Sequence, residues 1–264
     1  MNFKQKSRKG KIMVKSMKYI MQYYDKINAM LKRLFEEQGE NMQKAAEKIV
    51  DTVTRDGDNM IYIFGCTHAG IIAQEAFYRT GGLAVINPIF PPGLMCDITP
   101  STLTSKLERI DGYGAVIADE YNIKKGDLLI IHSVSGRNSV PVDMAIRAKE
   151  IGAYVIAITS LEYSKASKSR SKSGKNLYEV ADLVIDNCGE IGDASVEIDG
   201  FEQKTSPTST VTGAAIINAI TAQAAGIFIE RGITPPVFIS ANIDGGDEKN
   251  AVLMKKYRNR IKYL

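Results

Sequence analysis

The chain of 264 residues is 44% hydrophobic, which is enough to bury the core of one α/β domain. Its formal charge of +4 depends on residues 1–24, which hold seven Lys and Arg and no acid, so residues 25–264 carry a net charge of −3 and offer no basic surface for nucleic acid. The three cysteines are widely spaced without a C-x-x-C pair, which argues against disulfides and a structural zinc site and indicates the reducing cytoplasm.

The N-terminal region is expected to hold a short basic arm followed by two helices. Residues 1–14 are predicted to be disordered, and residues 15–264 are expected to form a single domain. Apolar residues recur every three or four positions over 17–34 and again over 42–53, with Gly39 between the two stretches. The pattern predicts an N-terminal helical hairpin. Such a hairpin often packs against a second subunit, so we expect a homodimer or a homotetramer.

Beyond residue 57 the sequence alternates between short apolar runs and helical segments. The runs are rich in Ile, Val and Leu without polar alternation, as in strands that are covered on both faces. They are Met60–Phe64, Leu83–Ile86, Leu128–Ile131, Tyr154–Ile158 and Leu183–Ile185. The helical segments between them are Ala69–Arg79, Leu103–Asn122 and Val140–Gly152. This rhythm predicts an α/β fold, a three-layer α-β-α doubly wound sandwich around a five-stranded parallel sheet.

Two further segments belong to the expected domain. The stretch Ser164–Lys175 is rich in Ser and Lys and is predicted to be a solvated loop, whose cations could attract an anionic substrate. The most apolar long stretch, Val211–Ile229, contains Thr212 and Asn218, which are costly in lipid. We therefore predict a buried helix there and no membrane partner. A C-terminal helix is expected to follow it.

The clearest functional signal is the segment HSVSGRN, residues 132–138, which connects the third predicted strand to the next helix. Ser133 and Ser135 supply two hydroxyls, and Gly136 lets the backbone bend and expose its N–H groups. Asn138 is placed to cap the helix. Ligands bind beyond the carboxyl ends of parallel strands, where helix N-termini carry partial positive charge. The segment therefore predicts a pocket for a tetrahedral anion such as phosphate.

Other common ways of binding a phosphorylated ligand are excluded by the sequence. Neither G-x-x-x-x-G-K-[ST] nor G-x-G-x-x-G occurs, so the chain has no P-loop motif and no dinucleotide fingerprint. No spacing of Cys, His and acidic residues indicates a metal site, and we expect neither a metal nor another cofactor. Hydroxyls and backbone amides are then left to hold the anion.

Three segments resemble the site of sugar isomerase (SIS) domains. Residues 133–138 resemble the phosphate-binding loop S-x-S-G-x-[TSN], and FGCTHA at 64–69 resembles the first loop, which faces the sugar. PTST at 207–210 resembles the start of the helix that closes the site. All three occur in the order of the family, and the likeness covers roughly residues 45–235. The segments FYRTGG, DNCG and SANIDGGDE resemble a phosphoheptose isomerase-like branch.

This resemblance implies a single SIS domain over residues 15–264 that binds a phosphorylated sugar. The positions that match the family's motifs are expected to contact it: Thr67, Ser133, Ser135, Gly136, Arg137, Asn138, Thr208 and Ser209. The implied activity is a cofactor-independent aldose-ketose isomerisation of a sugar phosphate.

Two departures from the family concern the catalytic group. The usual Ser of the first loop is Ala69, and the usual catalytic Glu is Arg79. Glu75 sits one helical turn before Arg79 and can face the same side. An aldose-ketose isomerisation moves a proton between neighbouring carbons, which requires a carboxylate or an imidazole. We therefore expect His68 and Glu75 to be the catalytic pair.

Other titratable residues and other functions stay open. His132 is expected to orient the phosphate loop, and Glu190 and Asp193 compete as acids because they follow the fifth strand at the binding edge. One alternative function is a non-catalytic phosphosugar sensor, although the chain has no helix-turn-helix pattern. Another is an etherase or lyase that cleaves a C–O bond with the same general base.

Overall fold

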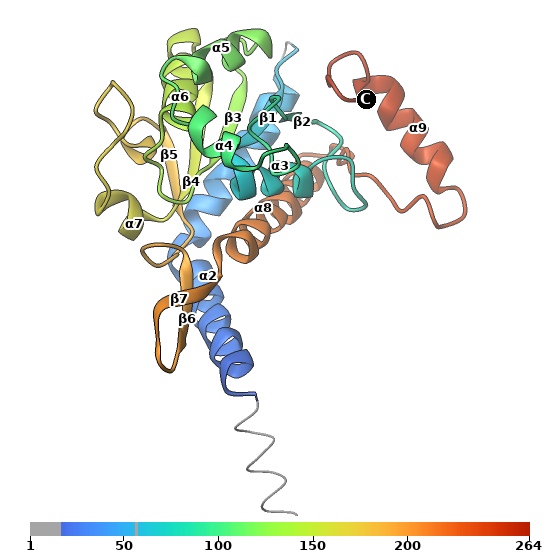
Figure 1. Ribbon diagram of the computed structural model, residues 1–264. Coiled ribbons are helices and arrows are strands. Elements are labelled where there is room, and N and C mark those ends of the chain that lie inside the picture. Colours follow the sequence, from blue (N-terminus) through green and yellow to red (C-terminus); the bar gives the residue numbers. More distant parts are fainter. Residues whose placement is uncertain (1–16, 56–57) are drawn as a thin grey trace, which may run out of the picture.

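A computed structural model describes residues 17–55 and 58–264 (Figure 1), so the expected arm of residues 1–14 lies outside the described residues. At its centre is a sheet of five parallel strands in the order β2-β1-β3-β4-β5. The strands are β1 (Ile61–Gly65), β2 (Ile86–Ile89), β3 (Leu128–His132), β4 (Tyr154–Thr159) and β5 (Leu183–Asp186). The order reverses between β1 and β3, which is where doubly wound sheets bind ligands.

The second strand is displaced from its predicted position. Leu83–Ile86 was the expected run, whereas β2 begins at Ile86 and ends at Ile89. Leu83 instead forms an antiparallel bridge with Val237, from the segment that follows the last core helix. The run is apolar because this segment covers it. The apolar composition of this run therefore did not distinguish it from a strand of the sheet.

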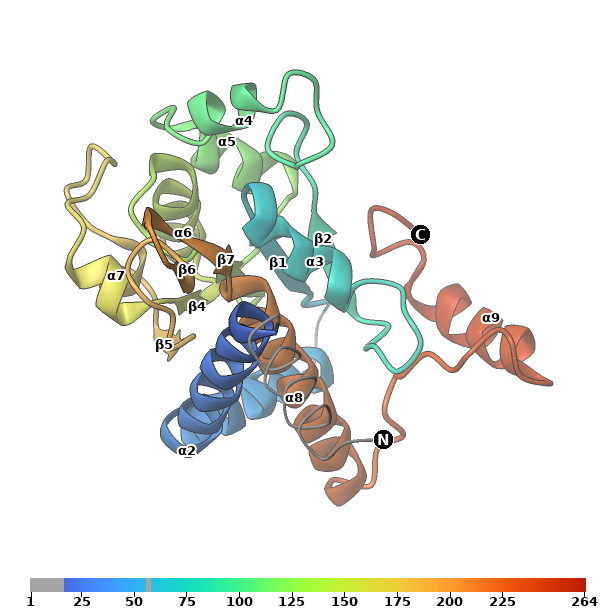
Figure 2. The ribbon, with the colours of Figure 1, turned by 60° about the horizontal axis from the view of Figure 1, so that its bottom comes forward.

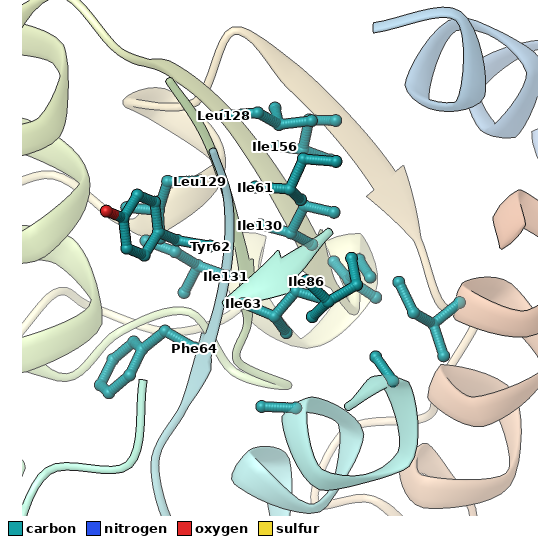
Figure 3. Close-up of a cluster of buried hydrophobic side chains, with 14 of the residues drawn as sticks. Ile61, Tyr62, Ile63, Phe64, Ile86, Leu128, Leu129, Ile130, Ile131 and Ile156 are labelled. Carbon is teal, nitrogen blue, oxygen red and sulfur yellow. The ribbon is translucent and has the colours of Figure 1, made fainter. Parts of the chain in front are cut away.

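Both faces of the sheet are buried, which explains why its strands lack polar alternation. On β1, Ile61 and Ile63 point to one side, and Tyr62 and Phe64 point to the other (Figure 3). None of these four side chains is more than 5% exposed. Burying a large apolar side chain contributes about 1.5–3 kcal/mol, so the central strands anchor the loops at their ends.

Helices cover the two faces in two layers, which confirms the predicted three-layer sandwich (Figures 1 and 2). On one face, α2 (Lys18–Thr54), α3 (Ile71–Ala76) and α8 (Ser209–Glu230) pack together. On the other face, α5 (Tyr113–Glu120) packs against α6 (Ser139–Ile151). Right-handed crossovers place the helices on these faces.

The predicted N-terminal helical hairpin is wrong, because α2 is one helix of 37 residues. Gly39 costs a helix about 1 kcal/mol relative to Ala, but it lies on the exposed side and no described atom lies within 4 Å of a Cβ built there. The buried positions continue in phase from Leu34 to Met42. Between them, Gln38 Oε1 accepts from the N–H of Asp186 at 3.2 Å. This tertiary contact favours a continuous helix over a turn.

Two other predicted helices are divided. The segment Leu103–Asn122 forms α4 (Thr102–Leu107) and α5, with Gly112 between them at φ 80°. The segment Ala69–Arg79 forms the 3₁₀-helix η1 (Thr67–Gly70) followed by α3. The remaining short helices are α7 (Leu161–Lys165) and η2 (Leu177–Glu179).

The C-terminal third adds a hairpin that the sequence did not predict. Strands β6 (Ala194–Ile198) and β7 (Phe201–Pro207) pair antiparallel and project beside the first half of α2 (Figure 1). Of the described helices, α8 is the one that is long and apolar enough to cross a membrane, and it packs along α2 and α3. The last helix, α9, spans Gly246–Tyr257.

Candidate functional site

The first loop makes a tight turn at the carboxyl edge of the sheet. A Cβ on Gly65 would lie 2.5 Å from the carbonyl carbon and oxygen of Ala69, so the turn requires glycine. Thr67 adopts a left-handed φ of 53°, which is rare for a β-branched residue, and donates its N–H to Leu94 O at 2.7 Å. Such strain costs about 1–3 kcal/mol and gathers at functional sites. The family's usual Gly at this position would avoid it.

The loop of residues 133–138 is anchored through its carbonyl groups. Those of Val134, Gly136 and Arg137 accept N–H groups from three later segments at 2.8–2.9 Å. In contrast, the N–H groups of residues 134–138 find no acceptor within residues 17–55 and 58–264. A loop whose carbonyls are engaged and whose N–H groups are free presents donors to an anion.

Gly136 is required here by conformation and by space. Its φ is 60°, and a Cβ at this position would approach Ser164 Oγ to 2.8 Å. The flanking hydroxyl residues Ser133 and Ser135 are half-buried and line the adjoining pocket. The loop therefore brings two hydroxyls and several N–H groups to one place, as its sequence predicted.

Asn138 occupies the N-cap position of α6, but its side chain does not cap that helix. Its Nδ2 donates to Glu108 Oε1 at 2.6 Å, and its Oδ1 accepts from Arg170 Nη1 at 2.8 Å. The prediction that this side chain caps α6 is wrong, because Glu108 and Arg170 engage both of its polar ends. Among the described residues no side chain accepts from the first N–H groups of α6, and that of Val140 donates to Glu108 O at 3.1 Å.

The N-terminus of α8 is closed by a carboxylate of the same chain. Asp193 Oδ2 accepts from Ser209 Oγ at 2.6 Å, and its Oδ1 accepts from the N–H groups of Ser209 at 2.9 Å and Thr208 at 3.2 Å. Thr208 is the N-cap residue and is fully buried. Negative charge is stabilising at a helix N-terminus. The carboxylate of Asp193 therefore occupies the place at the N-terminus of α8 where an anionic ligand would otherwise bind.

These three elements enclose a pocket of about 330 Å³ beyond β1 and β3. The predicted site residues in its lining are Thr67, His68, Ser133, Ser135, Asn138 and Ser209. Gly136, Arg137 and Thr208 are next to these in the chain but do not line the pocket. The volume suits a small polar ligand.

Glu75, predicted as a catalytic residue, does not line this pocket. It forms an ion pair with Arg79, and its Oε1 also accepts from Asn218 Nδ2 at 2.9 Å. Arg79 follows α3, which holds Glu75, and Asn218 belongs to α8. A catalytic role for Glu75 therefore stays a prediction that the pocket geometry does not support.

A different carboxyl group lines the pocket, that of Glu108. Burial raises the pKa of Glu108, while the nearby charges of Arg109 and Arg170 lower it by less. The sequence analysis missed this residue because it stands inside a segment that was predicted to be one helix. The glycine of the following Asp111-Gly112 pair, which divides that helix, was the signal that could have placed Glu108 at a turn.

The two histidines occupy different environments. His68 is exposed and lines the pocket. His132 is buried, and its Nδ1 lies 3.1 Å from Ala69 O. Burial lowers the pKa of His132, against the opposing effects of this hydrogen bond and of the charge on Asp193. The ring therefore links the first loop to β3, and its expected role in orienting the phosphate loop stays a prediction.

No three His, Cys, Asp or Glu side chains gather to hold a metal ion in the part of the chain that the structure describes. The pocket offers hydroxyls, backbone N–H groups and one carboxyl with raised pKa. The expectation that the protein uses no cofactor stays a prediction.

Comparison with known protein sequences agrees with the resemblance of the segments at 64–69 and 133–138, whereas the segment at 207–210 lies beyond the family match. The SIS domain family matches residues 22–160. A UPF0309 protein of Shouchella clausii (strain KSM-K16) is 49% identical over 248 residues, which cover 94% of this chain and 100% of the relative. A UPF0309 protein of Oceanobacillus iheyensis is 50% identical over the same length, with the same shares of both chains.

Solved structures of the same fold include two phosphoheptose isomerases. GmhA from Neisseria gonorrhoeae superimposes with a TM-score of 0.55 at 15% identity, covering 80% of this chain and 98% of that one. The enzyme from Francisella tularensis gives a TM-score of 0.50 at 16% identity, covering 79% and 97%. At these identities the likeness concerns the fold alone, and it confirms the predicted architecture.

Proposed function

This chain belongs to the SIS domain family, and we propose that it binds a phosphorylated sugar in its pocket and interconverts the aldose and ketose forms. The observation that carries this proposal is the set of N–H groups at residues 134–138, which have no acceptor elsewhere in the described chain. Ser133 and Ser135 add two hydroxyls beside them. A phosphate group accepts several hydrogen bonds at once, and the N-terminus of α6 favours its charge.

The sugar would extend from the phosphate toward the first loop. Thr67 and His68 line that end of the pocket. Asp193 also lines the pocket, but both of its oxygens are engaged by α8. Glu108 is then the carboxyl group with the best placement for proton transfer, because it lines the pocket and accepts only one side-chain hydrogen bond from the described residues, that of Asn138.

Glu108 has suitable chemistry for this step. Its raised pKa makes the carboxylate a stronger base than an ordinary glutamate at neutral pH. The carboxylate removes a proton from the carbon next to the carbonyl group and returns it to the former carbonyl carbon. His68 relays a second proton between the two oxygens. Each hydrogen that leaves the sugar is returned to it, so the reaction consumes no oxidant or reductant.

The direct test is exchange of solvent deuterium into the sugar. Purified protein is incubated in D2O with a panel of aldose and ketose phosphates, and NMR follows deuterium at C1 and C2. We expect exchange with at least one sugar and its loss in Glu108→Gln, with Glu36→Gln as a matched control on the exposed side of α2. Binding without exchange by any sugar would contradict isomerisation and support a sensor.

The same experiment separates the two carboxyl candidates. If Glu75→Gln abolishes exchange while Glu108→Gln retains it, the sequence-based assignment is correct and the pocket-based one is wrong. Both variants keep a side-chain oxygen that can accept a hydrogen bond, so their folded structures should be preserved. Thermal unfolding of each variant checks this.

A further inference from the structure

Three arginines from three separate segments of the chain lie near one another beside the pocket, although none of them is among its lining residues. Arg109 follows α4, Arg137 belongs to the loop after β3, and Arg170 lies in the stretch Ser164–Lys175. The N–H of Arg170 donates to Arg137 O at 2.8 Å. Burial, and then repulsion from Arg137 and Arg109, lower the pKa of the Arg170 guanidinium. The three cations are therefore close enough to repel one another.

These cations form no ion pair among the described residues, and the carboxyl group of Glu108 offsets only part of their charge. Among the described residues, no carboxylate oxygen lies within 4 Å of the charged nitrogens of any of the three. The buried Nε of Arg137 also has no acceptor there. Of the acidic side chains nearby, Asp111 pairs with Lys172, and Glu108 accepts a hydrogen bond from Asn138 while its charge acts on Arg109 and Arg170.

The cluster is held in place by its own loop. Arg170 O accepts from Ser139 Oγ at 3.2 Å, and Ser171 Oγ donates to Asp143 at 2.9 Å. The stretch Ser164–Lys175 is therefore braced against α6, although the sequence predicted a solvated loop. The guanidinium groups of Arg109 and Arg170 are exposed to solvent, and an anion that binds between the three cations would relieve their mutual repulsion.

The cluster also adjoins the pocket directly. Arg170 donates to the side chain of Asn138, whose other end donates to Glu108, and both Asn138 and Glu108 line the pocket. A phosphate group bound by the N–H groups of residues 134–138 has its hydrogen-bonding capacity largely used. The three arginines therefore exceed what a single phosphate requires.

We propose that Arg109, Arg137 and Arg170 form a second anion-binding subsite, so that the preferred substrate is a sugar phosphate with a further phosphate or carboxylate group. This inference rests on the proposed phosphosugar function and narrows its substrate class. Guanidinium groups bind phosphate and carboxylate equally well in bidentate geometry. The second anion occupies the rim beside Asn138 while the first occupies the loop after β3.

The test compares ligands with one and two anionic groups by isothermal titration calorimetry at fixed ionic strength. The probes are fructose 6-phosphate, fructose 1,6-bisphosphate and 6-phosphogluconate, so that the last two distinguish a second phosphate from a carboxylate. We expect at least one doubly anionic ligand to bind about tenfold more tightly than fructose 6-phosphate. Arg170→Gln should remove most of this advantage.

The matched control is Lys168→Gln, which removes one positive charge from an exposed position in the same stretch. It should retain the full preference, whereas a general electrostatic effect would weaken it in both variants. Thermal unfolding verifies that each variant is folded.

Three results would overturn the inference. Equal affinity for singly and doubly anionic sugars in the unmodified protein would show that the rim adds nothing. An equal loss of affinity for singly and doubly anionic sugars in Arg170→Gln would show that the arginines bind the first phosphate. If no sugar phosphate binds at all, the proposed function fails together with this inference, whereas binding of fructose 6-phosphate without a preference for a second anion refutes the inference alone.

Discussion

Two helices begin at the same pocket, and among the described residues only α8 has its N-terminus closed by a carboxylate side chain. At α8, Asp193 accepts hydrogen bonds from Thr208 and Ser209. At α6, the side chain of Asn138 is drawn away by Glu108 and Arg170. Both helix starts are rich in hydroxyls and look alike in sequence. The difference supports the proposal that the phosphate binds at the N-terminus of α6 and not at that of α8.

The largest effect should come from deforming the loop at α6. Gly136→Ala places a Cβ 2.8 Å from Ser164 Oγ at a left-handed φ of 60°. We expect the affinity for sugar phosphate, measured by calorimetry, to fall by about 100-fold or more, because several N–H donors are displaced together. Gly174→Ala is the matched control, since its φ is 72° with no described atom within 4 Å. Unchanged affinity in Gly136→Ala would contradict binding of the phosphate at the N-terminus of α6.

Removing the carboxylate at the N-terminus of α8 should affect the stability of the protein more than its affinity for sugar phosphate. Asp193→Ala removes the acceptor of four hydrogen bonds at the N-terminus of α8, two from Thr208 and two from Ser209. The free energy of unfolding should fall by about 2 kcal/mol, as urea denaturation would measure. Asp97→Ala, at an exposed position, serves as the control. A stability equal to that of the unmodified protein would mean that Asp193 is not the cap.

A pair of serine variants sharpens the comparison at the two helix starts. Ser135→Ala removes a pocket hydroxyl at the α6 loop and should weaken sugar-phosphate binding by about 1–3 kcal/mol. Ser209→Ala removes a hydroxyl that is already engaged by Asp193, so it should change binding by less than about 0.5 kcal/mol. Calorimetric titration of both variants decides between the sites. A larger loss of affinity in Ser209→Ala than in Ser135→Ala would indicate that the phosphate binds at the N-terminus of α8.

The smallest effect concerns the pH dependence of catalysis. Because the pKa of Glu108 is raised, its carboxylate is protonated at a higher pH than an ordinary glutamate, and kcat/KM should decline as the pH falls through that value. Arg170 lowers this pKa, so Arg170→Gln should move the acidic limb to higher pH. A pH-rate profile that is identical in both proteins would argue against Glu108 as the base.

The raised pKa of Glu108 also makes the free energy of unfolding depend on pH, in the opposite direction to kcat/KM. The folded protein holds the proton of Glu108 more tightly than the unfolded chain does. The contribution of this group to folding is therefore present at low pH and is lost as the pH rises through its raised pKa.

The sequence predicted the sheet and the loops better than the helices around them. Uninterrupted apolar runs identified four strands, since burial on both faces leaves no other pattern. The helix α2 was predicted as two because Gly39 resembles a break, whereas the contact of Gln38 with β5 keeps the helix whole. Local sequence does not report such a contact.

At the site, sequence motifs located the loops but not their partners. Ser133, Ser135 and Gly136 follow a recognisable spacing, and the structure brings Ser133 and Ser135 into the pocket. Glu108 comes from a turn that no motif marks, and the capping role of Asp193 depends on a loop after β5 that folds back onto α8. Both depend on tertiary contacts between distant segments, which a motif search does not detect.

The most direct test of the central claim is a crystal structure of the protein with a bound sugar phosphate. The phosphate should accept hydrogen bonds from the N–H groups of residues 134–138 and from Ser133 or Ser135, with Asp193 still bound to Ser209. A phosphate that displaces Asp193 at the N-terminus of α8, or that binds outside the pocket, would contradict the assignment.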